Sequence, residues 1–574
     1  MPGDRTASHA EVHQEVQDDA ALPDTALVAP GVRPGRLASR RLPGRAARWL
    51  AIFAVSLGLL LIRFLVPTPV GQSDNRDGPR LMCGRGLGLN PVVPHGDPRF
   101  FRFIYFQYAP SPACGHSLPY PTSELVPLEL ARFLTPVFGL PGTLNLIALG
   151  VLMCVIASVG VTSLATGLRM RLWAQLLVAA AAWLIIADAA FFDVFAGPFE
   201  EPAALTGLLL VAAGIVYLGR GWRATVFGLV LAGSGGFLAI LSKEQYLPLA
   251  VPICLTLILA SLHRSDGRWR DRFRTRQAAA AVAVAAVLAV LAGAYGAWDS
   301  RTAYGQRLHH IQVVDMVFQD IVNGHDNARA DLQALGLPVS WAKYGGTFYW
   351  DIRSVRTSPL YQRYEARFSD GNIARFLLTH PGRMVSIGQQ AAQQAQLFRV
   401  TALGDYPPDA GHPPGAIESR VAVVTWLVHR LPPRLGLLWL IPLWCVMAAV
   451  AILALRRRGR PWHRDGAMLV LCMTGCAIVA FVPPAYFAGI STSRHLVGMN
   501  LATALAFVLS VALAASMAAQ RRAARRAGRA APRERPARSA RAALGNGRDA
   551  GRSWPASSPR CAAARRTRPA RAPG

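Results

Sequence analysis

The chain has 574 residues, of which 52% are hydrophobic, and its formal net charge is +29. Several of its apolar runs are longer than the roughly eighteen residues that a helix needs to cross a bilayer. These properties exclude a soluble globular enzyme and predict an all-α polytopic membrane protein.

The predicted elements begin with residues 1–48, a polar segment rich in Pro and Arg for which we expect disorder. The apolar runs that follow predict about ten transmembrane helices, seven within residues 49–298 and three within residues 435–518. The expected spans are 49–67, 138–162, 172–188, 202–219, 224–241, 245–262, 277–298, 435–455, 466–484 and 496–518.

The connections between these spans predict the orientation of the chain in a cell membrane. The arginine-rich connections belong in the cytoplasm by the positive-inside rule, and so do both termini; they are 169–171, 220–223, 263–276 and 456–464. This leaves the loop 68–137 and a helical segment, 299–434, on the extracytoplasmic face. Within the loop, residues 123–138 have the pattern of an amphipathic interfacial helix.

The last segment, residues 519–574, carries sixteen arginines against only Glu534 and Asp549. Such a sequence cannot bury enough apolar surface to fold, so we expect it to be disordered. We expect the anionic inner leaflet of the membrane, rather than nucleic acid, to be its partner.

Two of the eight cysteines, Cys83 and Cys114, lie in the same outer loop. They would form a disulfide if that face of the membrane is oxidising, and the sequence leaves this open. Five others lie within apolar runs, where we expect them to pack as small hydrophobic side chains.

Carboxylates gather where the spans reach the outer face. Asp74 and Asp77 follow the first span, and they would share a helix face if that helix continued. Alternatively, they mark the solvated end of the span. The second outer turn carries four more acids, of which Glu201 also suits the start of the next helix; they are Asp188, Asp193, Glu200 and Glu201.

Cations lie on the same predicted face, against the positive-inside bias. Lys243 and Gln245 belong to a short hairpin between two spans, and Arg494 and His495 precede the last span. A lysine at this depth can also extend its ammonium group toward water without binding a ligand. Together these residues would place carboxylates and cations at the level of the lipid headgroups.

This pattern suits the transfer of a sugar from a lipid phosphate to a hydroxyl group. A carboxylate would accept the proton of the hydroxyl, and cations would hold the phosphate as it leaves. We expect Asp74 to be the base, with Asp77 assisting or binding a metal. Glu200 and Glu201 are the alternative acids; Lys243 and Arg494 would hold the phosphate, and Gln245 would orient it. The sequence leaves open whether a divalent cation, Mg²⁺ or Mn²⁺, takes part.

The chain resembles the GT-C superfamily of integral membrane glycosyltransferases, and within it the bacterial glycan-biosynthesis hexosyltransferases of the WsfD type. The resemblance rests on the order of five motifs between about Trp49 and Met517. They are Asp74-Asn75-x-Asp77, the turn "FAGPFEEPAAL", Lys243-x-Gln245, His380-Pro381 and "LGDY" at 403–406. It implies an inverting transfer of a hexose from a polyprenyl-phosphate donor to a cell-envelope glycan or lipid-linked acceptor, on the extracytoplasmic face.

Two other classes of function compete with this interpretation. A transporter or flippase usually has two related halves and polar residues near the middle of the membrane. This chain has no evident repeat, and its charges lie mostly at the ends of spans. A non-catalytic assembly protein for envelope polysaccharide would not need the carboxylates and cations, so substituting Asp74 should leave it active.

Overall fold

The computed structural model describes residues 44–93, 97, 99–114, 120–262, 271–323, 327–457, 461–487, 489 and 492–530. The disorder expected for residues 1–48 and 519–574 therefore lies mostly outside the described residues. Of the described parts of these segments, residues 45–48 and 519–530 are helical because they continue the first and last membrane helices. Ala and Arg both have high helix propensity, which favours this extension.

Each of the ten expected spans corresponds to a helix. In chain order the helices are α1 (Arg45–Leu65), α5 (Leu146–Gly167), α6 (Leu172–Ala187), α8 (Glu201–Ile215), α9 (Trp222–Ile240), α10 (Ala250–Leu262), α11 (Asp271–Arg301), α19 (Leu437–Arg456), α20 (Pro461–Tyr486) and α22 (Val497–Ala530).

Within the described residues, eight apolar helices are long enough to cross a membrane, α10 being counted from Glu244. The number is nine if α6 is counted as one span with the short segments after it, which bend away by 62° at Asp188. The remaining one, α8, is apolar but has 15 residues. The chain is therefore a multi-pass helical membrane protein, and about ten spans agree with its helices.

Close packing of small residues holds α8 at the centre of this bundle. All 15 residues of α8 are buried. A Cβ atom added at Gly207 would lie 2.5 Å from the carbonyl oxygen of Gly235 in α9. A Cβ added at Gly235 would lie 2.6 Å from the carbonyl oxygen of Gly207. The two backbones thus approach as closely as small-residue interfaces allow in membrane proteins.

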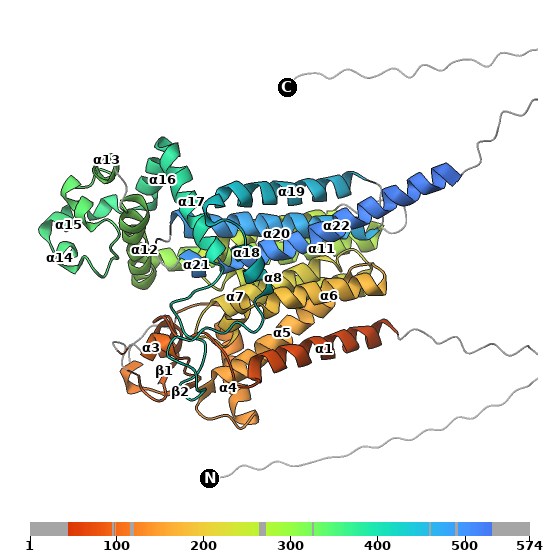
Figure 1. Cartoon of the computed structure of the whole chain (residues 1–574), viewed down its shortest axis with the longest axis horizontal. Helices are drawn as coiled ribbons and strands as arrows, with labels where there is room; N and C mark the ends of the chain where they lie inside the picture. Colours follow the sequence, from red (N-terminus) through yellow and green to blue (C-terminus); the bar gives the residue numbers. More distant parts are fainter. Residues whose placement is uncertain are drawn as a thin grey trace, which may run out of the picture.

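The outer loop and the long outer segment gather at one end of the bundle (Figure 1). The loop contains three short helices, α2 (Gly78–Met82), α3 (Arg99–Arg102) and α4 (Leu125–Val137). Its strands β1 (Leu87–Leu89) and β2 (Gln107–Pro110) form a small antiparallel sheet with β3 (Leu144–Asn145), in the order β1-β2-β3 and with Leu87 opposite Pro110. Strand β3 lies within the span expected at 138–162, whose helix, α5, begins only at Leu146. Strands of two to four residues are too short to show a periodic pattern, so the sequence did not predict them.

Helix α4 forms where the amphipathic pattern predicts a helix. Val126, Leu130, Phe133 and Val137 are exposed and follow one another at helical spacing. Leu128, Ala131 and Thr135 lie buried on the opposite face. An exposed apolar stripe of this kind suits the boundary between headgroups and acyl chains.

The outer segment, 299–434, is helical with its own apolar core, which includes Phe318, Trp341 and Phe376. Its helices are α12 (Ala303–Asp315), α13 (Ala328–Ala334), α14 (Arg353–Arg356), α15 (Pro359–Tyr364), α16 (Asp370–Thr379), α17 (Pro381–Leu397) and α18 (Val423–His429). Two short helices complete the outer end: α7 (Ala189–Phe192) follows α6, and α21 (Thr492–His495) precedes α22. This end of the bundle therefore brings together segments that are far apart in the sequence.

Candidate functional site at the outer end of the bundle

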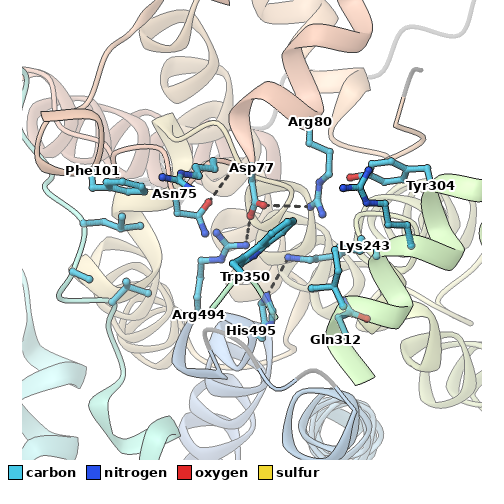
Figure 2. Close-up of a pocket in the computed structure, with 17 residues that line it drawn as sticks. Asn75, Asp77, Arg80, Phe101, Lys243, Tyr304, Gln312, Trp350, Arg494 and His495 are labelled. Atoms are coloured by element: carbon cyan, nitrogen blue, oxygen red, sulfur yellow. Dashed lines mark hydrogen bonds and ion pairs between the residues drawn. The ribbon is translucent and has the colours of Figure 1, made fainter. Parts of the chain in front are cut away.

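A cavity of about 740 Å³ opens where these segments meet. Its walls come from the first outer loop, the hairpin between α9 and α10, helix α12 and helix α21 (Figure 2). The lining includes Asn75, Arg76, Asp77, Arg80, Phe101, Lys243, Tyr304, Arg307, Gln312, Trp350, Arg494 and His495. Asp77, Lys243 and Arg494, which the sequence singled out separately, thus share one cavity.

Three cations converge on this cavity, and we call Arg80, Lys243 and Arg494 the cavity cations. Arg494 forms an ion pair with Asp77, and Arg80 lies 4.0 Å from the same carboxylate. Lys243 and Arg494 are 2% and 3% exposed, although both reach the cavity wall. Burying three positive charges together requires nearby negative charge.

Glu200 and Glu201 supply that negative charge from behind the cavity wall. Both are fully buried at the start of α8. Glu200 pairs with Arg80 and lies 3.9 Å from the Lys243 ammonium group. Glu201 lies 3.4 Å from Lys243 and 3.2 Å from Nε of Arg494. Neither is among the described residues that line the cavity, so their position suits counter-ions better than bases.

The two acids of the first motif occupy different environments. The Asp74 carboxylate is 5% exposed, and its Oδ1 accepts hydrogen bonds from the backbone N–H groups of Arg76 at 2.7 Å and Gly78 at 2.9 Å. Burial raises the pKa of Asp74 to about 7. Asp74 is not among the described residues that line the cavity. It shapes the turn that presents Asp77.

Asp77 faces the cavity. Burial would raise the pKa of its carboxyl group, but Arg494 and Arg80 outweigh burial and lower that pKa.

Between the two acids, Arg76 adopts a left-handed backbone conformation, with φ 82°. A residue other than glycine rarely adopts this conformation, and such positions cluster at functional sites. The Arg76 guanidinium lies 5.4 Å from the centre of the Phe101 ring, also in the cavity wall.

His495 and Gln245 support the cation side of the cavity. Burial, reinforced by Lys243 and Arg494, holds the pKa of His495 well below its ordinary value, so its imidazole is neutral. Its Nε2 lies 3.3 Å from Nζ of Lys243 and can accept a hydrogen bond from the ammonium group. The side chain of Gln245 donates to the backbone carbonyl of His495 at 3.3 Å. Gln245 therefore holds α21 in place, and it is not among the described cavity-lining residues.

The other two acids of the second outer turn lie elsewhere. Asp188 accepts hydrogen bonds from the backbone N–H groups of Val424 and Thr425, at 2.7 and 3.1 Å, and so anchors the start of α18. Asp193 pairs with Arg63 and Arg399 in a separate buried cluster. The contacts of Asp188 and Asp193 therefore stabilise the packing of the outer end of the bundle.

Several cavity residues were not predicted from the sequence. Arg80 lies three residues after Asp77, a spacing that can pair charges, and this was the only local signal for it. Tyr304, Arg307 and Gln312 of α12 and Trp350 reach the cavity from the outer segment. Their contribution depends on how the segment folds back over the bundle, which no local pattern reveals.

Cys83 and Cys114 are joined by a disulfide, with an S–S distance of 2.08 Å. The bond ties the end of α2, which carries Arg80, to the segment that follows β2. Across the described residues, no group of three or more His, Cys, Asp and Glu side chains is arranged to hold a metal ion.

The fold and the cavity together define a class: a polytopic helical membrane protein with a charged cavity at one end of its bundle. The model of the YfdI N-terminal transmembrane domain family matches residues 39–530. The chain belongs to this family, and the match covers all ten membrane helices and both outer segments. No curated protein and no solved structure matches the chain.

Proposed function

We propose that the chain is an inverting glycosyltransferase of the GT-C type. It moves a hexose from a polyprenyl-phosphate donor to a cell-envelope glycan or a lipid-linked acceptor on the extracytoplasmic face. One observation carries the proposal: Asp77 and the three cavity cations face one cavity at the end of a membrane bundle. The family match and the order of the motifs in the sequence support the same class of enzyme.

The cavity cations fit the phosphate of the donor. Guanidinium groups bind phosphate oxygens through paired hydrogen bonds, and a lysine adds a point charge. Arg80, Lys243 and Arg494 are held by Glu200 and Glu201, so they are oriented before any ligand arrives. Pre-oriented charges stabilise the negative charge that develops on a leaving phosphate without reorganising during the reaction.

Asp77 is the proposed base, because it is the acid of the first motif that faces the cavity. Without ligand, its carboxylate pairs with Arg494 and Arg80, which lowers its pKa. A bound phosphate would compete for these two arginines, and the pKa of Asp77 would rise toward the range useful for proton transfer. Asp74, which the sequence favoured as base, would instead position Asp77 through the turn that it caps.

The proposed step is a single displacement at the anomeric carbon. The acceptor oxygen forms a bond to this carbon from the side opposite the phosphate, and the bond from the carbon to the phosphate oxygen breaks. The hydroxyl proton passes to Asp77. The electron pair of the broken bond stays with the phosphate oxygen, beside Arg80, Lys243 and Arg494. One displacement of this kind inverts the configuration of the sugar.

The experiment is sugar transfer in membranes that carry the chain, with radiolabelled polyprenyl-phosphate mannose, glucose and galactose offered in turn. We expect one donor to be used and Asp77→Asn to abolish transfer, whereas Asp409→Asn, an exposed acid of the outer segment, should not. A flippase would instead carry the labelled lipid across the membrane without transferring the sugar. An assembly protein would remain functional with Asp77→Asn.

A further inference from the structure

A second set of charges lies behind the cavity, and the proposed reaction does not use it. Five of its six members are buried, and Arg420 is 32% exposed. We call this set the buried charge cluster; it consists of Arg63, Asp193, Arg399, Asp405, Glu418 and Arg420. The three arginines and three acids balance in charge, and none is among the described residues that line the cavity.

The cluster joins four distant parts of the chain through Arg399 and Arg63. Arg399 pairs with Asp193 at 2.8 Å and also with Asp405. Arg63, near the end of α1, pairs with Glu418 and lies 3.4 Å from Asp193. The carboxylate of Asp405 also accepts a hydrogen bond from the backbone N–H of Glu418 at 2.7 Å.

The same residues hold the stretch that leads to the acid motif. The backbone N–H of Gly71 donates to the carbonyl of Asp405 at 3.1 Å, and that of Gln72 donates to the carbonyl of Asp193 at 2.8 Å. The backbone N–H of Ser73 donates to the carbonyl of Gly404 at 2.8 Å. The backbone of residues 71–73 is therefore hydrogen-bonded to two members of the cluster, Asp193 and Asp405, and to the neighbour of Asp405, Gly404.

The cluster also supports a wall of the cavity. Val400, Ala402 and Leu403 line the cavity and lie between Arg399 and Asp405 in the chain. A rearrangement that separated one of these buried pairs would leave an uncompensated charge. The buried charge cluster therefore has few alternative geometries. A rigid support of this kind fixes where a neighbouring functional group lies.

We propose that the buried charge cluster is a positioning device, in which Arg399 and Asp405 set the place of residues 71–77 relative to the cavity cations. Its consequence for catalysis rests on the proposed function, but the positioning itself does not. Arg399 and Asp405 are positioning residues because they act through residues 71–73 and not on the substrate.

The first experiment measures backbone hydrogen exchange in the full chain, in lipid nanodiscs, over peptides that contain residues 70–78. We expect Arg399→Gln to speed exchange at Gly71 and Ser73 by about tenfold or more, because a buried pair is broken. Arg399→Lys, which keeps the charge, should restore part of the protection. Asp465→Asn is the control, since it breaks the buried Arg220–Asp465 pair, which lies between the starts of α9 and α20.

Unchanged exchange at residues 71–73 in folded Arg399→Gln would overturn the proposal, as would an equal change in Asp465→Asn. This readout needs no activity, so it stands if the wild-type chain transfers no sugar. Where transfer is observed, we expect kcat to fall by about a hundredfold in Arg399→Gln, the scale of a small misplacement of a reacting group. The KM for the donor should change little, because the cavity cations are intact.

Discussion

At the scale of single residues, the site depends on how each charge is neutralised. Asp77 and the cavity cations neutralise one another at the cavity surface, while Glu200 and Glu201 complete the balance from behind. Asp74 is different, because its carboxyl group is buried and only backbone N–H groups donate to it among the interactions that the structure describes. Burial outweighs these N–H donors, which lower the pKa, and raises the pKa of Asp74 to about 7.

The raised pKa of Asp74 has a consequence for stability. In the unfolded chain this carboxyl group ionises near its ordinary pKa, whereas in the folded chain it keeps its proton up to about pH 7. Folding therefore takes up a proton between these values, and stability falls as the pH rises through this range. We expect Asp74→Asn to raise the melting temperature by about 3 °C at pH 8. The difference should shrink at pH 5, and a difference independent of pH would contradict this explanation.

Lys243 offers a direct test of phosphate binding. Removing its ammonium group leaves Glu200 and Glu201 paired with Arg80 and Arg494, so the fold should survive. We expect Lys243→Ala to weaken binding of the polyprenyl-phosphate donor by about tenfold or more, the value of a charged hydrogen bond. Binding can be measured with labelled donor and purified chain.

The control for this variant is Lys343→Ala, which removes the other lysine of the chain. Lys343 lies 5.1 Å from the centre of the Tyr344 ring, in the outer segment, and is not among the described cavity-lining residues. Equal loss of donor affinity in the two variants would argue against a phosphate site at Lys243.

At the scale of elements, α8 sets the position of the counter-ions. Glu201 begins this helix. The helix packs against α9, and the end of α9 leads into the hairpin that contains Lys243. The contact relies on glycine: a Cβ at Gly207 would collide with the backbone of Gly235. Sliding of the two helices would therefore shift a carboxylate and a cation of the site together.

We expect Gly207→Ala to reduce the amount of folded protein and its melting temperature, because the backbone of α9 must move. Gly58→Ala is the matched control, since a Cβ at Gly58 in α1 meets no atom within 4 Å. Detergent-solubilised yield and thermal unfolding measure the effect. Equal behaviour of the two variants would contradict the close packing of α8 and α9.

The membrane helices and part of the site could be predicted from the sequence. Long apolar runs identify the ten helices, because a bilayer requires apolar segments of that length. Charged residues at the ends of spans identified Asp77, Lys243 and Arg494. Local patterns could not separate the roles of Asp74 and Asp77, which depend on the turn at Arg76. Asp405 belongs to the "LGDY" motif, but its pairing with Arg399 and the place of Trp350 depend on the folding of the outer segment against the bundle.

At the scale of the whole molecule, both outer segments lie at the same end of the bundle (Figure 1), and residues of both line the cavity. The positive-inside rule predicts that this end faces away from the cytoplasm. In a chain in which Cys445, exposed in the structure, and Cys561 of the last segment are both replaced by Ser, we expect Trp350→Cys to react with a membrane-impermeant maleimide in intact cells. Arg169→Cys should react only after the membrane is opened. The reverse pattern would place the cavity in the cytoplasm.

The most direct test of the account compares Asp77→Asn with Asp74→Asn in purified chain, with the donor that the wild type uses. Donor binding and sugar transfer are measured for each variant. We expect both variants to bind donor, and Asp77→Asn to lose transfer by about a thousandfold, as for removal of a catalytic base. Asp74→Asn should keep transfer within about tenfold of the wild type, because Asn can still accept the backbone hydrogen bonds that shape the turn. Transfer by Asp77→Asn at the wild-type rate would contradict the account.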